Sequence, residues 1–187
     1  SACRRDARVD GLTPIARAAP RDGGAPSYTD RELRARVPGG EALDEVLRVA
    51  LLAPMDVVVL RARRGRAWES WAVDARGAQT GLAGAARVLQ GWSAMSYEPF
   101  TEDLARVVGL FALPDAQVFT AREVVETDGG PRWARPASLS RRDASGSRVL
   151  SFSYRDPRGA LRVASYRLEA TGAVRVLLPE PGSEGRR

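Results

Sequence analysis

The N-terminal part of the chain combines short apolar periods with proline and glycine stops, a pattern that predicts helices. A first helix is expected from Thr29 to Val37, because Thr29-Asp30-Arg31-Glu32 is a capping box that satisfies the exposed backbone N–H groups of a first turn. Pro38-Gly39-Gly40 ends this helix. Apolar residues then recur at helical spacing as far as Pro54 and predict a second helix, carried by Leu43, Val46, Leu47, Ala50 and Leu51.

The next sixty residues predict a hairpin followed by two more helices. Val57 to Arg63 and Arg66 to Val73 have the composition of strands, and Arg64-Gly65 between them predicts a turn. One helix is expected from about Gly81 to Gln90 and another after Thr101. Their buried faces are expected to consist of Leu82, Ala85, Ala86 and Leu89 in the first, and of Leu104, Val107, Val108 and Phe111 in the second.

From residue 116 onward the apolar period changes to two, which is typical of strands. Tight turns such as Asp156-Pro157-Arg158-Gly159 favour antiparallel neighbours. Strands are expected at 118–127, 132–140, 148–155, 161–169 and 173–178. The sequence therefore predicts an α+β fold. N-terminal helices and a hairpin precede a C-terminal antiparallel β-meander of about five strands, with helices packed on one face.

Composition divides the 187 residues into three parts. Residues 1–26 are poor in large apolar side chains and contain proline and glycine, so they are expected to form a flexible tether. Residues 27–179 have the length and patterning of a single α+β domain. Residues 180–187 are expected to be a frayed tail.

The first three residues, Ser1-Ala2-Cys3, resemble the tail of a lipobox, the motif of bacterial envelope lipoproteins. In that class small residues precede a cysteine that receives diacylglycerol. The resemblance implies a lipid on Cys3, a membrane anchor, and a domain held on the periplasmic side of the bacterial cell envelope. The alternative is a cytoplasmic protein.

Composition also limits the chemistry, because all 29 basic residues are arginines and the chain has no lysine, histidine or asparagine. Without imidazole the chain lacks the usual general base and the usual nitrogen ligand of transition metals. Without lysine it has no Schiff-base amine. We therefore expect no cofactor, no metal and no catalytic residue. An enzyme that uses only carboxylates and arginines remains a third hypothesis. The arginine bias itself is typical of a GC-rich genome.

The main hypothesis is a non-catalytic module that contacts protein partners within an envelope assembly. Its candidate contact residues lie in an aromatic-rich loop between the two later helices, because loops concentrate binding residues. They are Trp92, Tyr97 and Phe100. The alternative for this loop is that its rings fold back and close the edge of the core.

The runner-up hypothesis is binding of a polyanion, meaning nucleic acid, anionic lipid or glycan. Arginines interleaved with tryptophan could contact a phosphate backbone and stack on bases. The candidate residues are Arg61, Arg63, Arg64, Arg66, Arg141 and Arg142. The alternative is a solvated sheet face, with part of the arginine excess satisfied internally, because the predicted helices are acidic and the strands basic.

Overall fold

The computed structural model describes residues 28–49 and 57–177. The predicted tether, Cys3 and the predicted tail at 180–187 lie outside the described residues. None of the helices within these two ranges is long and apolar enough to cross a membrane.

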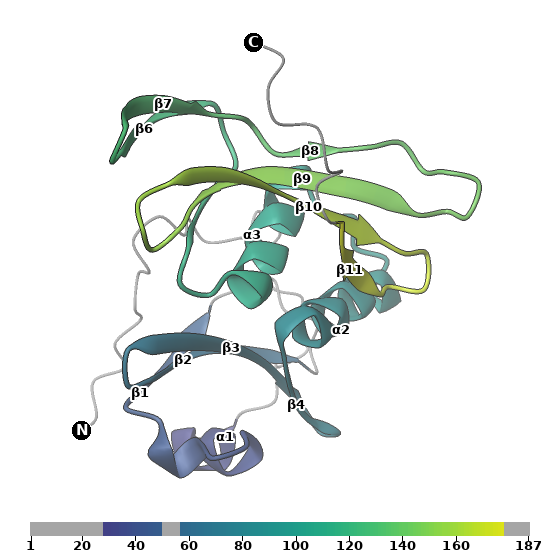
Figure 1. The fold of residues 1–187 in the computed structure, drawn as a ribbon. Helices are drawn as coiled ribbons and strands as arrows, with labels where there is room; N and C mark the ends of the chain where they lie inside the picture. The colour runs from purple at the N-terminus through teal and green to yellow at the C-terminus, as the bar shows by residue number, and fades with distance from the viewer. Residues whose placement is uncertain (1–27, 50–56, 178–187) are drawn as a thin grey trace.

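The N-terminal part forms a four-stranded antiparallel sheet with a helix on one face (Figure 1). The helix α1 (Asp30–Arg36) has the predicted capping box, with the Thr29 and Glu32 side chains bonded to each other's backbone N–H. The sheet follows the order β1-β2-β3-β4. Its elements are a 3-10 turn η1 (Gly40–Ala42), β1 (Glu45–Val49), β2 (Val58–Arg64), β3 (Ala67–Asp74) and β4 (Gly77–Thr80).

The prediction of a second helix is wrong for the described residues, because residues 45–49 form strand β1, and Ala50 and Leu51 lie outside the described residues. This strand pairs with β2 from Glu45↔Arg63 to Val49↔Val59. Val46 packs in the cluster beneath α1, whereas Val49 packs in the cluster on the opposite side of the sheet. Because both sheet faces are covered, apolar residues three positions apart point in opposite directions, and their spacing imitates a helical period.

The predicted hairpin is confirmed as β2 and β3, with its turn one residue later than expected. Arg64 pairs with Ala67, so Gly65 and Arg66 form the two-residue turn. Gly65 has a φ of +60°, which suits glycine in such a turn. The short strand β4 was not expected from the sequence.

The two later helices are confirmed as α2 (Gly81–Ala94) and α3 (Thr101–Ala112), and α2 extends four residues beyond the predicted end at Gln90. The helices pack against each other through Gly84, where an added Cβ would lie 2.5 Å from Phe111 Cε1. This close approach explains a glycine inside a helix despite its low helix propensity.

The C-terminal half forms the antiparallel sheet β11-β10-β9-β5, with β8 also pairing with β9. Its strands are β5 (Gln117–Phe119), β8 (Ser138–Leu139), β9 (Arg148–Arg155), β10 (Leu161–Leu168) and β11 (Val174–Val176). Strands β9 and β10 confirm the prediction almost to the residue. The predicted strands at 118–127 and 132–140 are each divided in two, because β6 (Glu123–Thr127) and β7 (Gly130–Ala134) leave the sheet as a separate hairpin.

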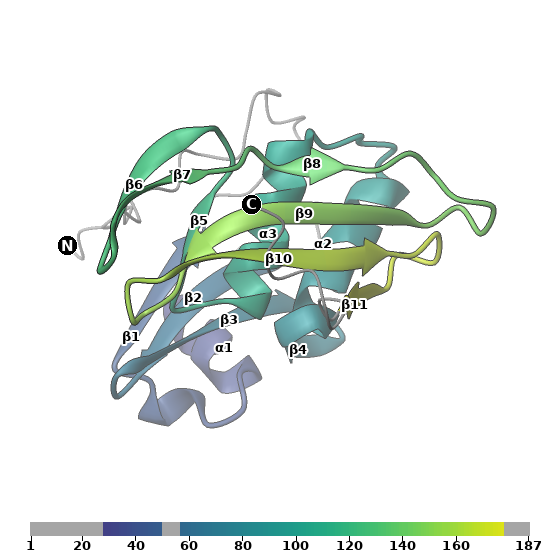
Figure 2. The same cartoon turned by 45° about the horizontal axis from the view of Figure 1, so that its top comes forward.

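The hairpin of β6 and β7 packs over one end of the second sheet through a small apolar cluster of Phe119, Val125, Ala134 and Leu161. Helices α2 and α3 lie between the two sheets (Figures 1 and 2). The largest core cluster joins residues of both sheets to both helices, among them Val59, Val88, Val108 and Phe152. The fold is therefore α+β as predicted, and the helices that cover one face of the C-terminal sheet also cover the N-terminal sheet.

Candidate functional site

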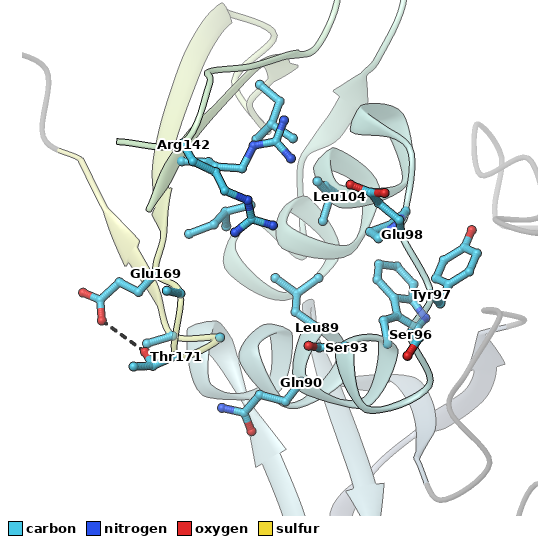
Figure 3. Close-up of a pocket in the computed structure, with 18 residues that line it drawn as sticks. Leu89, Gln90, Ser93, Ser96, Tyr97, Glu98, Leu104, Arg142, Glu169 and Thr171 are labelled. Atoms are coloured by element: carbon cyan, nitrogen blue, oxygen red, sulfur yellow. Dashed lines mark hydrogen bonds between the residues drawn. The ribbon is translucent and has the colours of Figure 1, made fainter. Parts of the chain in front are cut away.

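A cleft of about 510 Å³ opens between the C-terminal half of α2 and the second sheet (Figure 3). We call it the α2–β9 cleft. One wall is α2 with the α2–α3 loop, and the other is formed by the segment between β8 and β9 and by the β10–β11 turn. Its lining residues include Trp92, Tyr97, Glu98, Arg142, Arg148 and Thr171. The structure thus brings Trp92 and Tyr97 together with Arg142, which the sequence analysis had assigned to a different hypothesis.

The α2–α3 loop has a fixed backbone because α2 ends in a Schellman motif. The N–H of Tyr97 donates to the Trp92 carbonyl at 2.9 Å, and the N–H of Ser96 donates to the Ser93 carbonyl at 2.9 Å. Ser96 adopts the left-handed conformation that this motif requires, with a φ of 54°. The rings of Trp92 and Tyr97 meet edge to face with centroids 5.6 Å apart, which supplies the apolar contact that usually accompanies the motif.

The three predicted contact residues have different environments. Trp92 is 1% exposed and belongs to the core, so its ring supports the loop from below. Tyr97 is half-buried; burial, together with the negative charge of Asp103, raises the pKa of its hydroxyl. Phe100 is 62% exposed. The structure adds Met95, which is 42% exposed and caps α2.

Arg142 and Arg148 are the cations of the cleft. Arg142 Nη1 donates to the Gly146 carbonyl at 3.3 Å, and Arg148 Nε donates to the Ser140 carbonyl at 2.9 Å. These bonds hold each side chain in place and leave further N–H donors on both guanidinium groups. Within the described ranges neither arginine forms an ion pair, in contrast to eight arginines elsewhere in the fold.

The β10–β11 turn closes one end of the cleft. Glu169 forms an ion pair with Arg175 at 2.5 Å and accepts a hydrogen bond from Thr171, so its charge is largely compensated. Gly172 has a φ of +84° and lies close to α2, where an added Cβ would be 2.6 Å from Gln90 Cγ. The turn therefore lies close to the Gln90 side chain of α2.

Most of the hairpin arginines that the sequence assigned to polyanion binding have internal partners. Arg61 lies 4.4 Å from the Trp68 ring centroid and donates to the Pro114 carbonyl at 2.8 Å. Burial lowers the pKa of its guanidinium, and Asp115 and Glu45 oppose that shift. Arg63 lies near Glu45 at 3.8 Å, and Arg64 lies 3.9 Å from Glu69. These contacts support the expectation that part of the arginine excess is satisfied internally.

The remaining candidates of that hypothesis do not form one surface. Arg66 is exposed at the tip of the β2–β3 hairpin, and Arg141 is exposed between β8 and β9. These segments lie at opposite ends of the molecule in both ribbon views (Figures 1 and 2). A single polyanion strand would have to cross the whole domain to contact both groups.

Three carboxylates lie outside the cleft and have a lowered pKa. Hydrogen bonds lower the pKa of Glu32, Asp143 and Asp156, so these three groups are ionised at neutral pH. In the described part of the chain, no three His, Cys, Asp or Glu side chains lie close enough to hold a metal ion.

Comparisons with protein-family models, with curated proteins and with solved structures find no match for this chain. A function is therefore proposed from the sequence and from the arrangement of these residues.

Sequence reasoning did not connect the two walls of the cleft. Arg148 and Thr171 are far along the chain from Trp92, and no local pattern relates them. Met95 could have been found, since it lies between Trp92 and Tyr97 in the aromatic-rich loop that the sequence already indicates. The role of Arg148 could not, because it depends on how β9 lies across α2.

Proposed function

We propose that this protein is a non-catalytic contact module of a bacterial cell envelope assembly, and that a protein partner docks on the α2–α3 loop. The observation that carries this proposal is the exposure of Phe100 and Met95 on a loop whose backbone is fixed. Large apolar side chains that are already held in place lose little conformational freedom on binding, which favours affinity.

The buried residue beneath the loop, Trp92, favours the same function. Trp92 is buried and packs edge to face on Tyr97, so the loop cannot collapse onto the core without displacing a tryptophan. Glu98 is exposed two residues before Phe100 and adds negative charge to the loop. We expect the partner surface to combine an apolar pocket for Phe100 with basic residues around it.

Site-specific photo-cross-linking in the native envelope tests this contact. A benzophenone side chain at position 100 is expected to give a discrete protein adduct, and the same group at position 163 is not. Val163 is a matched control because it is an exposed apolar residue, 55% accessible, on strand β10. The adduct from position 100 should disappear when Met95→Asp is added, since a charge would be placed in the apolar contact. Equal adducts from positions 100 and 163 would contradict the proposal.

The envelope location is a separate part of the proposal and is supported by the Ser1-Ala2-Cys3 resemblance. The protein is expected to fractionate with membranes and to gain the mass of a lipid at Cys3. The variant Cys3→Ser should move to the soluble fraction. An unmodified Cys3 thiol on protein taken from native membranes would refute the lipid anchor and leave the contact surface to be judged by cross-linking.

A further inference from the structure

We propose that the α2–β9 cleft is a binding site for a small amphiphilic monoanion, namely a carboxylate attached to an apolar body. This site does not depend on the contact surface of the α2–α3 loop. The two features share one wall, but a ligand in the cleft would touch different atoms from a partner that covers Phe100.

The anionic end of the ligand is inferred from Arg142 and Arg148. Both line the cleft, and in the described structure neither is neutralised by an ion pair. Each is held by one hydrogen bond to a backbone carbonyl, which leaves the guanidinium positioned with donors available. Guanidinium groups bind carboxylates through paired N–H donors, and these charge-assisted bonds are stronger than neutral ones.

The apolar end is inferred from the leucines that line part of the cleft, whose remaining lining is largely polar. Leucines from four different elements line it beside the buried ring of Trp92: Leu89, Leu104, Leu139 and Leu168. Ligand sites place polar groups beside apolar ones and have volumes of about 300 to 1,000 Å³. The cleft volume of about 510 Å³ lies inside that range.

The charge balance favours one negative charge on the ligand. Figure 3 shows Arg142 on the sheet side of the cleft and Glu98 on the helix side. Glu169 is already paired with Arg175 outside the cleft. Among the described lining residues, two arginines without an ion pair face one carboxylate without one, which is a single excess positive charge and suits a carboxylate better than a dianionic phosphate.

The test uses octanoate as the probe and octanamide, its neutral isostere, as the ligand control. Binding is measured by calorimetry, and the site is located from backbone amide shifts in NMR spectra of the whole chain. Octanoate is expected to shift the amides of Ser93, Arg148 and Thr171, and to bind about tenfold more tightly than octanamide.

The protein controls are neighbouring arginines. Arg142→Gln is expected to weaken octanoate binding about tenfold, because it removes one charged donor group. Arg141→Gln should leave binding unchanged, since Arg141 is adjacent in sequence but does not line the cleft. Arg148→Gln is expected to weaken octanoate binding by a similar factor. If Arg148→Gln fails to fold, the affinity of Arg142→Gln is the deciding measurement.

The site would be overturned by equal binding of octanamide, equal loss in Arg141→Gln, amide shifts outside the cleft, or no octanoate binding up to about 10 mM. Binding only of an apolar peptide through its C-terminal carboxylate would also overturn it, in favour of a peptide groove. Because the cross-linking at position 100 does not involve this ligand, each proposal can fail while the other stands.

Discussion

Ser96 shows how one residue determines the shape of the candidate contact surface. Its φ of 54° lies in the left-handed region, where a side chain is unfavourable and glycine is usual. The conformation is required because the two hydrogen bonds that close α2 both depend on it. The left-handed conformation of Ser96 therefore places Tyr97 against Trp92, and it sets the direction of the chain toward Phe100.

Replacing Ser96 by glycine should consequently stabilise the protein. We expect Ser96→Gly to raise the free energy of unfolding by about 0.5 to 1 kcal/mol, because the relief of backbone strain exceeds the added chain entropy. Urea denaturation measures the change. The control Ser93→Gly lies within α2 and should destabilise by about 0.5 kcal/mol, since glycine is the poorer helix former. A loss of stability in Ser96→Gly would contradict the Schellman assignment.

At the scale of elements, Asp74 joins three parts of the N-terminal half. It ends β3 and is buried, and its Oδ2 lies 3.3 Å from Arg87 Nε on α2. Its Oδ1 accepts the Arg76 N–H at 2.8 Å, and its carbonyl accepts from Arg36 of α1 at 3.2 Å. One residue thus ties the sheet to the helices on both of its faces.

Removal of the Asp74 charge should therefore be costly. Asp74→Asn keeps an acceptor for the Arg76 N–H but leaves the mostly buried Arg87 without its anion. We therefore expect the free energy of unfolding to fall by about 2 kcal/mol or more. Glu69→Gln is the matched control, because the Glu69–Arg64 pair at 3.9 Å is more exposed and should contribute less than about 0.5 kcal/mol. Equal losses in the two variants, measured by chemical denaturation, would show that Asp74 is not a junction.

In the whole molecule, the helices are enclosed between two antiparallel sheets. Tyr166 lies on β10 of the C-terminal sheet, and the ionisation of its hydroxyl shows whether this side of the core excludes water. It is buried and stacks on Phe152 with ring centroids 5.7 Å apart. Burial, with a smaller effect of Tyr154, raises the pKa of Tyr166 to about 12. In the unfolded chain a tyrosine ionises near about pH 10.

Stability should therefore decline in alkali. The stability linked to the neutral Tyr166 hydroxyl is fully present below about pH 10 and is lost as the pH rises toward about 12, because only the unfolded chain ionises readily in that window. Tyr166→Phe keeps the stacked ring and should remove this part of the pH dependence. Urea denaturation at about pH 9 and about pH 11 measures it. An unchanged decline in Tyr166→Phe would show that the hydroxyl is not shielded.

The sequence predicted the elements whose patterns are local and failed where distant contacts decide. The capping box of α1, the buried stripe of α3 and the alternation in β9 each depend on neighbouring residues, and all three are confirmed. Strand β1 was mistaken for a helix because pairing with β2 and burial on both faces produced a helix-like spacing. The α2–β9 cleft was likewise beyond prediction, since its two walls meet only in the folded chain.

Oxidative footprinting of the proposed envelope assembly is the most direct test for a partner docked on the α2–α3 loop. Hydroxyl radicals modify exposed methionine and aromatic side chains, so the purified protein should react at Met95, Phe100 and the exposed Trp133. In the assembly we expect the reaction to fall severalfold at Met95 and Phe100 and to stay unchanged at Trp133. Unchanged reaction at Met95 and Phe100 in the assembly would contradict a partner docked on the α2–α3 loop.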